Sequence, residues 1–173
     1  MLEILSKRDF PGMYSLMEES FPSDEYRPYE EQLALMSLDE YKVFVKKNGN
    51  KVSAFAAVWE FCDFMFIEHL AVDASLRNNG VGGAVLQELT ERTDKLVLLE
   101  VELPREMIAK RRIGFYERNG FFYNDYDYTQ PPISEGRSPV PLRIMTYGRH
   151  ISEEEFISIK SILYRTVYKQ KEV

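Results

Sequence analysis

The sequence predicts a mixed α/β or α+β fold in one domain, residues 1–173. A chain of this length is usual for a single domain. Strand-like runs dominate the first half, whereas apolar residues at helical spacing alternate with strands in the second half. Near the middle, a glycine-rich turn joins a strand to a helix. This order of elements is typical of a sheet with helices packed against it.

Composition excludes several classes of protein. The chain has 22 Lys and Arg against 28 Asp and Glu, a formal net charge of −6, so we expect neither nucleic acid nor a membrane surface as a partner. An apolar content of 45% is enough for a core. Cys62 is the sole cysteine, which excludes an intramolecular disulfide and a cysteine zinc cluster. Without a membrane-length apolar run or a signal-peptide pattern, the protein is expected to be cytoplasmic.

The first half is expected to contain one short strand, two helices and three longer strands. A strand at 2–4 precedes a helix whose apolar residues recur every three or four positions as far as Phe21. Ser6 and Asp9 suit a capping box at the start of that helix. A polar, aromatic loop is then expected at 21–29, a short helix at 30–36, and strands at 41–47, 52–61 and 64–72, the first two joined by an Asn-Gly-Asn turn at 48–50.

The second half alternates helices with strands. Helices are expected from Val81 to about Arg92 and from about Met107 to Asn119, the second ended by a left-handed Gly120. The apolar run at 95–101 between them indicates a strand buried on both faces. The remaining elements are strands at 121–126 and 142–147, a proline-rich loop at 130–141 and a last helix at about 152–169.

The glycine-rich turn is the strongest local sign of a ligand. Glycines at a helix start let a ligand approach backbone N–H groups and the positive end of the helix dipole, an arrangement that favours phosphate. Arg77 adds a positive charge. A triphosphatase loop is excluded because Ala84, not Lys, follows Gly83, and a dinucleotide fingerprint is disfavoured because Val85 stands where its third Gly is required. Taken alone, the turn could also simply redirect the chain.

Two segments together resemble the signatures of the GNAT acetyltransferases, and they lie in the family's order within residues 64–92 and 107–126. The first reads Leu70-Ala71-Val72-Asp73, then Leu76-Arg77-Asn78-Asn79-Gly80-Val81-Gly82. The second reads Gly114-Phe115-Tyr116-Glu117-Arg118-Asn119-Gly120-Phe121. The resemblance covers roughly residues 41–147. It implies the GNAT fold, a mixed, mostly antiparallel sheet flanked by helices, here with an extra C-terminal helix.

The resemblance also implies acetyl coenzyme A as co-substrate and no metal. Main-chain groups of Leu70, Ala71 and Val72 would pair with the pantetheine arm. One departure is Ala109, which stands where many members carry an Asn that contacts pantetheine. The neighbouring Arg111 and Arg112 either pair with a coenzyme phosphate or form an exposed basic face. The pyrophosphate would be held by the backbone of Arg77, Asn78, Asn79, Gly80, Val81, Gly82 and Gly83.

The reaction that the resemblance implies is acetyl transfer to an amine by direct attack. Tyr116 matches the tyrosine that protonates the departing thiolate, a role that suits a phenol, although a core aromatic is the alternative. Glu68 stands where a carboxylate can accept the amine proton, directly or through water. The other candidates for this base are His69, expected on the opposite strand face from Glu68, and Glu100 and Glu102, expected to share a face.

The acceptor is expected to be a small-molecule amine, and the acidic balance favours a cationic one. A protein or peptide N-acetyltransferase and a non-catalytic acyl coenzyme A binding module stay open as alternatives. The variable segments 21–29 and 127–141 are expected to shape the acceptor pocket, with Tyr26, Tyr29, Tyr123, Tyr126 and Tyr128 either lining it or packing on the sheet. Phe156, Ile159, Leu163 and Val167 form one face of the last helix, expected to dock on the chain's own sheet or, alternatively, to form a dimer contact; a monomer or homodimer is therefore expected.

Overall fold

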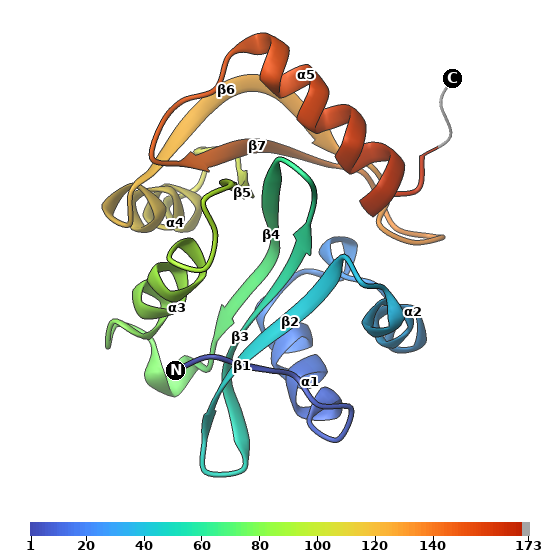
Figure 1. Cartoon of the computed structure of the whole chain (residues 1–173), viewed down its shortest axis with the longest axis vertical. Helices are drawn as coiled ribbons and strands as arrows, with labels where there is room; N and C mark the ends of the chain where they lie inside the picture. The colour runs from blue at the N-terminus through green and yellow to red at the C-terminus, as the bar shows by residue number, and fades with distance from the viewer. Residues whose placement is uncertain (171–173) are drawn as a thin grey trace. The chain divides into compact units, whose positions relative to one another are not determined.

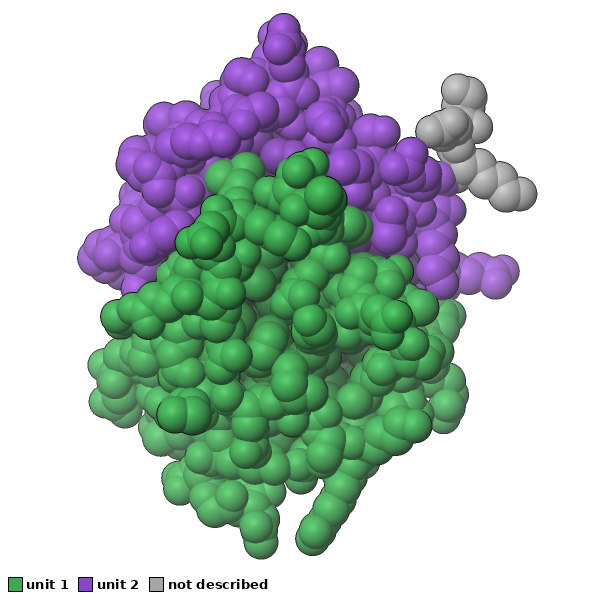
Figure 2. All heavy atoms as spheres, viewed as in Figure 1, with its two compact units in different colours: residues 1–22, 28–97 green, residues 23–27, 98–173 purple. Residues whose placement is uncertain are grey.

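A computed structural model describes residues 1–170, and the chain forms two compact units (Figure 2). The first unit comprises residues 1–22 and 28–97, and the second comprises residues 23–27 and everything from 98 onward. A five-residue piece of the N-terminal half therefore belongs to the second unit. The single domain expected over 1–173 stays a prediction. Within residues 1–170, no helix is both long and apolar enough to cross a membrane.

Four antiparallel strands form the framework of the first unit. They are β1 (Glu3–Ile4), β2 (Tyr41–Asn48), β3 (Lys51–Glu60) and β4 (Phe64–Val72), adjacent in that order. Asn48 pairs with Lys51 across the expected hairpin turn, in which Gly49 has a φ of 62°. Residues Val52 to Trp59 of β3 are all buried, so this strand lies at the centre of the unit's core.

Helices pack against these strands, and in Figure 1 the strands run between α3 on one side and α1 on the other. The helices are α1 (Phe10–Ser20), α2 (Tyr29–Ala34), extended by a 3-10 turn at Leu35–Ser37, and α3 (Val81–Thr90). Both α1 and α3 contact β3 and β4. The helical spacing seen in the sequence is confirmed, because Phe10, Met13 and Met17 are at most 1% exposed.

The capping box expected for the first helix is wrong. Asp9 is the residue before α1 and makes no side-chain cap bond, while the Ser6 hydroxyl donates to Asp9 Oδ2 (2.7 Å) in the turn ahead of the helix. Pro11 occupies the first helical turn, where its missing N–H costs nothing. The helix therefore begins at Phe10, too late for Ser6 to cap it.

The second unit is built on three antiparallel strands in the order β5-β7-β6. They are β5 (Leu96–Glu102), whose first two residues belong to the first unit, β6 (Phe121–Gln130) and β7 (Val140–Tyr147). The proline-rich loop is shorter than expected, because Gln130 pairs with Val140 and the loop covers only 131–139. Pro141 is tolerated in the central strand because β5 pairs only as far as Leu142, so no ladder bond to β5 is lost.

Two helices complete the second unit, α4 (Met107–Arg118) and α5 (Glu153–Ile162), which runs into a π-helical turn at Leu163–Val167. Both helices contact β6 (Figure 1). Ser152 and Glu155 form a complete capping box at the start of α5. The expected docking of the last helix on the chain's own sheet is confirmed: Phe156 stacks on Tyr126 of β6 at 4.8 Å. The apolar face is at most 6% exposed, over Phe156, Ile159, Leu163 and Val167.

Gly120 is expected to tolerate no side chain. Its φ is 85°, and an added Cβ would lie 2.9 Å from Cε2 of Tyr147. Gly120→Ala should therefore lower the free energy of unfolding by about 2–4 kcal/mol, from left-handed strain plus the clash. Gly136→Ala is the matched control, because Gly136 has a φ of 78° but open space around it. It should cost only about 1 kcal/mol. Denaturant unfolding measures both, and equal losses would contradict the role of Tyr147.

Candidate functional site

The glycine-rich turn connects β4 to α3 and leaves a helix start open. Gly80 precedes the helix in a left-handed conformation with φ 76°, and an added Cβ there would meet nothing within 4 Å. Asn78 also has a positive φ, 64°. The Ala84 N–H makes the first helical bond, to the Gly80 carbonyl (3.0 Å), so the N–H groups of residues 81–83 point out of the helix end. This geometry suits a phosphate-bearing ligand.

Charged side chains hold the base of this turn in place. Exposed Arg77 donates through Nε to the Val72 carbonyl (3.0 Å), which ties it to the end of β4. Asp73 accepts from the Ser75 N–H (3.0 Å) and pairs with Lys51 Nζ (2.5 Å). The hydrogen bonds from Lys51 and Ser75 hold the pKa of Asp73 well below its usual value. The turn is thereby anchored to the β2–β3 hairpin by an ionised, paired carboxylate.

A β-bulge in β4 sets the direction of the Glu68 side chain. Ala57 pairs with His69 and Val58 with Ile67, so Glu68 is the extra residue that faces no partner on β3. Its side chain is 2% exposed and accepts from Trp59 Nε1 (3.0 Å). Nothing in the sequence marks Trp59 as a partner of Glu68, because this contact depends on the shifted register of two strands.

The expected alternation of Glu68 and His69 is wrong. His69 Nδ1 lies 3.8 Å from Glu68 Oε2, a separation that side chains on opposite faces of a regular strand do not reach. The bulge breaks the two-residue period and brings both groups to one side. Phe21, the residue that follows α1, packs edge-on against the His69 ring, with the two ring centroids 4.9 Å apart. The first unit thus places two candidate proton acceptors together.

In the second unit, Glu100 is held by two tyrosines. Tyr168 Oη lies 2.8 Å from both carboxylate oxygens, and Tyr128 Oη donates to Oε1. Glu102, two residues on, pairs instead with Arg112 of α4 at 3.3 Å. Of the two arginines, Arg111 is exposed, whereas half-buried Arg112 is engaged with a carboxylate rather than forming a free basic face.

Glu25 lies near Glu102 and Arg112. It belongs to the segment 23–27 of the second unit, which begins with a 3-10 turn at Ser23–Glu25. Burial raises the pKa of Glu25 to about 7, the charges of Glu102 and Asp24 add to the rise, and Arg112 opposes it. The Asp24 backbone and side chain accept from Gln130 Nε2 (3.2 Å) and the Ser138 N–H (2.9 Å). This loop is expected from the sequence to shape the acceptor pocket, but no sequence pattern marks Glu25, because its neighbours Glu102 and Arg112 lie far along the chain.

Tyr116 lies on α4, one turn after Arg112, and is 8% exposed. Its ring meets Phe115 and Phe121 edge-on at 5.2 and 5.9 Å. Burial raises the pKa of Tyr116 to about 12, although the charge of Arg112 opposes the rise. The phenol therefore keeps its proton throughout the neutral range, as a proton donor must.

The predicted set of tyrosines is divided between the two units. Tyr29 lies in the first unit, packed edge-on against Phe10 and Tyr14 at 5.1 and 5.0 Å. Tyr26 and the three β6 tyrosines lie in the second unit, where Tyr126 donates to the Ile151 carbonyl (3.0 Å). Tyr29 and Tyr126 thus make contacts within their own units, and their place in the acceptor pocket stays a prediction.

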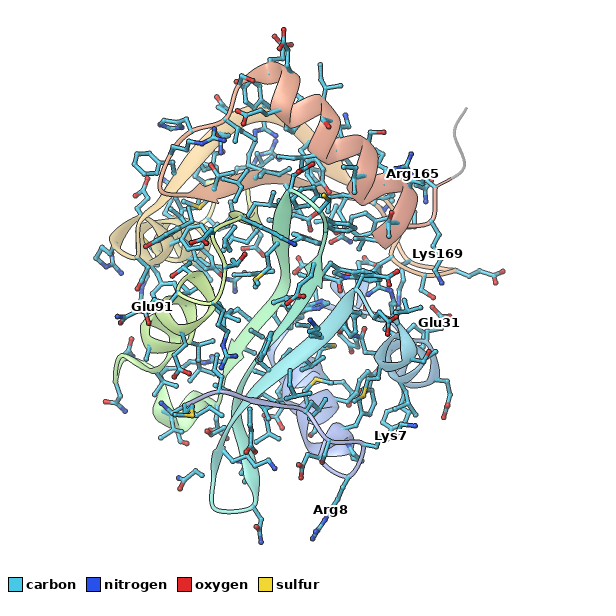
Figure 3. The ribbon with its side chains drawn as sticks, viewed as in Figure 1. Lys7, Arg8, Glu31, Glu91, Arg165 and Lys169 are labelled. Atoms are coloured by element: carbon cyan, nitrogen blue, oxygen red, sulfur yellow. The ribbon has the colours of Figure 1, made fainter. Side chains whose placement is uncertain are left out.

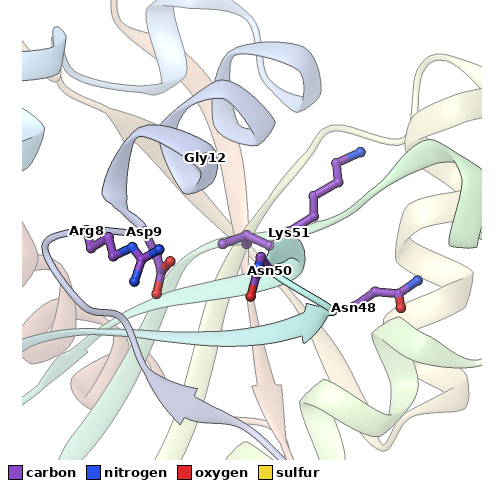
Figure 4. Close-up of a pocket in the computed structure, with 7 residues that line it drawn as sticks. Arg8, Asp9, Gly12, Asn48, Asn50 and Lys51 are labelled. Atoms are coloured by element: carbon purple, nitrogen blue, oxygen red, sulfur yellow. The ribbon is translucent and has the colours of Figure 1, made fainter.

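A separate hollow of about 520 Å³ lies in the first unit, between the start of α1 and the β2–β3 hairpin (Figure 4). None of the predicted site residues lines it; its lining is Arg8, Asp9, Gly12, Asn48, Asn50, Lys51 and Val52. Across residues 1–170, no group of three or more His, Cys, Asp or Glu side chains is arranged to hold a metal ion.

Comparison with known proteins identifies the family. The model of the acetyltransferase (GNAT) family matches residues 10–121. A solved structure described as "Putative acetyltransferase from GNAT family from Bacteroides thetaiotaomicron" shares 33% identity, with 99% of both chains covered and a TM-score of 0.91. A Bacillus subtilis (strain 168) protein named "Putative acetyltransferase YjbC" is 25% identical over 163 residues, 92% of this chain and 82% of that protein.

More distant structures share the fold. A GNAT family acetyltransferase from Elizabethkingia anophelis, solved with acetyl-CoA bound, is 16% identical with a TM-score of 0.60 over 85% of this chain and 96% of that one. The chain belongs to the acetyltransferase (GNAT) family, and it is therefore an acyltransferase. The fold class and the family expected from the sequence are confirmed.

The raised pKa of Glu25 predicts a pH-dependent stability. Folding raises this pKa from 4.5 to about 7, so the folded state binds more protons between these values and the free energy of unfolding falls as the pH rises through them. Glu25→Gln removes that loss. Allowing for partial solvent exposure, the variant should exceed the wild type by about 1–2 kcal/mol at about pH 8, and the gain should vanish below about pH 4.

Denaturant unfolding across pH measures this difference. Glu135→Gln, which removes an exposed carboxylate from the same unit, is the charge-matched control. A Glu25→Gln stability curve parallel to that of the wild type at every pH would contradict the buried environment of Glu25.

Proposed function

We propose that the chain transfers an acetyl group from acetyl-CoA to a primary amine of a small cationic molecule. The observation that carries the proposal is the open helix start at Gly80, where backbone N–H groups and Arg77 suit a polyanionic ligand. Membership of the GNAT family supports this choice of ligand. We further propose that residues 1–173 work as one acetyltransferase domain, because the family match extends from the first unit into the second.

For acetyl-CoA, we propose that the backbone of residues 77–83 binds the pyrophosphate. The sequence Arg77, Asn78, Asn79, Gly80, Val81, Gly82, Gly83 offers little side-chain bulk at the helix start, and Arg77 supplies a fixed charge. Leu70, Ala71 and Val72 are proposed to pair through their main chain with the pantetheine arm. Arg112 is left out of this proposal because it is engaged with Glu102.

In the proposed reaction, the neutral amine attacks the thioester carbonyl, the carbon–sulfur bond breaks, and the acetyl group ends as an amide. Glu68, oriented by Trp59, accepts the proton that the amine loses, directly or through a water. Tyr116, whose phenol is protonated at neutral pH, donates its proton to the departing thiolate. One proton is thus taken up and one is delivered, so the step needs no metal and no covalent intermediate on the protein.

The direct test is an acetyl-transfer assay on a panel of small amines and short peptides, with detection of the released thiol. We expect amine-dependent thiol release and an acetylated small amine by mass spectrometry. Turnover of peptides alone would support the protein-modifying alternative. Tight acetyl-CoA binding in calorimetry without any acetylated product would support a binding module instead.

Tyr116→Phe should lower kcat by about a hundredfold, because a general acid contributes roughly that factor. The dissociation constant for acetyl-CoA, measured by calorimetry, should stay within about threefold, since only the departing thiolate needs the hydroxyl. Tyr147→Phe, which removes a hydroxyl from β7 in the same unit, is the control and should keep its activity. Wild-type turnover in Tyr116→Phe would remove the assigned acid.

Glu68→Gln should lower kcat/KM by about a hundredfold near neutral pH. The loss should shrink as the pH rises, because a growing concentration of hydroxide can then take the proton that the attacking amine loses. A pH–rate profile of both proteins measures this recovery. Glu60→Gln is a matched control on β3, where Glu60 pairs with Lys42 at 2.5 Å. A pH-independent loss in Glu68→Gln would instead indicate a purely structural role.

A further inference from the structure

In the second unit, an ion pair holds Arg112 on the face of α4 that carries Tyr116. Arg112 precedes Tyr116 by four residues, so the two side chains leave the helix on the same face, one turn apart. Arg112 Nη1 donates to Glu102 Oε2 of β5 (3.3 Å). The ion pair joins α4 to β5 and restricts the positions that the guanidinium can take.

The surroundings of Arg112 differ from those of the fully solvated charges of the chain. Arg8 and Glu91, labelled in Figure 3, project outward from the ribbon, and both are exposed. Arg112 and Glu102 are half-buried, with 38% and 34% of their side-chain surfaces exposed. A charge that lies partly out of water is screened less, so it acts more strongly on a neighbouring group.

The neighbouring group on which this charge acts is the phenol of Tyr116. Its ring is packed between Phe115 and Phe121, and the residue is 8% exposed. Burial raises the pKa of Tyr116 to about 12, and the charge of Arg112 acts in the opposite direction. Burial by itself makes the phenol a weaker acid, because it disfavours the phenolate that remains after the proton has left. A positive charge on the same helix face stabilises that phenolate.

The proposed acetyl transfer contains a step in which this stabilisation matters. When the phenolic proton moves to sulfur, the O–H bond breaks, the S–H bond forms, and the electron pair of the broken bond stays on the phenolate oxygen. The phenolate then regains a proton from solvent before the next turnover. A guanidinium suits this step because it stays protonated and can stabilise the developing negative charge without itself giving up a proton.

We propose that Arg112 is a positioning residue for the reaction: held by Glu102, it keeps a positive charge near Tyr116 and favours transfer of the phenolic proton to the departing thiolate. The inference rests on the proposed acetyl transfer, in which Tyr116 is the acid. This role differs from the contact with a coenzyme phosphate that the sequence left open for Arg112.

The kinetic test is Arg112→Gln, which removes the charge and keeps a polar side chain. Its kcat should fall about tenfold, the factor that corresponds to one unit in the acidity of a proton donor. Arg112→Lys keeps the charge and should retain kcat within about threefold. Lys110→Gln is the matched control, because it removes a charge from an exposed position of the same helix, and it should keep the wild-type kcat. Denaturant unfolding verifies that each variant is folded at the assay temperature.

A double-mutant cycle tests whether Arg112 acts through Tyr116. In the Tyr116→Phe background, Arg112→Gln should lower kcat by less than about twofold, because no phenolic proton is left to transfer. The full tenfold loss in that background would overturn the inference. A tenfold weaker binding of acetyl-CoA to Arg112→Gln, measured by calorimetry and accompanied by an unchanged kcat, would also overturn it and would indicate a phosphate contact instead.

A spectroscopic titration separates this inference from the proposed activity. Replacement of Tyr116 by difluorotyrosine gives a phenol that ionises at lower pH, and fluorine NMR follows its ionisation apart from the other tyrosines. Arg112→Gln should raise the pKa of this phenol by at least about 0.5, whereas Lys110→Gln should leave it unchanged. A raised pKa supports the coupling between Arg112 and position 116 even if no amine is acetylated. An unchanged pKa in Arg112→Gln overturns the inference.

Discussion

The register shift in β4 is the constraint on which the rest of the first unit depends. One extra residue, Glu68, faces no partner on β3, and this turns its carboxylate toward Trp59 and brings His69 to the same side. Beyond the bulge, pairing resumes from His69 to Val72, so the strand reaches the glycine-rich turn in regular register. A bulge therefore lets one strand carry the proposed proton acceptor and lead directly into the proposed phosphate-binding helix start.

Four carboxylates of this acidic chain show how neighbours assign different properties to one chemical group. Glu68 accepts a bond from an indole, Glu100 from two phenols, and Glu102 pairs with a guanidinium. Glu25, beside other carboxylates, is instead shifted toward its protonated form. A neutral hydrogen-bond donor orients a carboxylate, a cation compensates its charge, and burial favours its protonated form. The carboxylates that contribute to the net charge of −6 consequently differ in their hydrogen-bond partners and in how readily they ionise.

Much of the fold was predictable because local signals decide it. The Asn-Gly turn at 48–50, the left-handed Gly120 and the apolar spacing of α1 depend on residues close together in the chain, and the structure contains each of them. The errors have three separate causes. A proline in the first turn determines where α1 begins, and pairing with β7 determines the length of β6. The alternation expected for Glu68 and His69 failed because a bulge interrupts the two-residue period of the strand.

The sequence by itself determined the family, and it was enough to propose residues 77–83 as an anion site and Tyr116 and Glu68 as catalytic candidates, because glycine placement and short motifs are read from neighbouring residues. The surroundings of those groups were settled by folding. Tyr168 meets Glu100 across 68 positions, and Arg27 meets Val167 across 140. Such pairs follow from how strands and helices pack, since burial, charge and hydrogen-bond partners of a side chain come mostly from residues far away in the sequence.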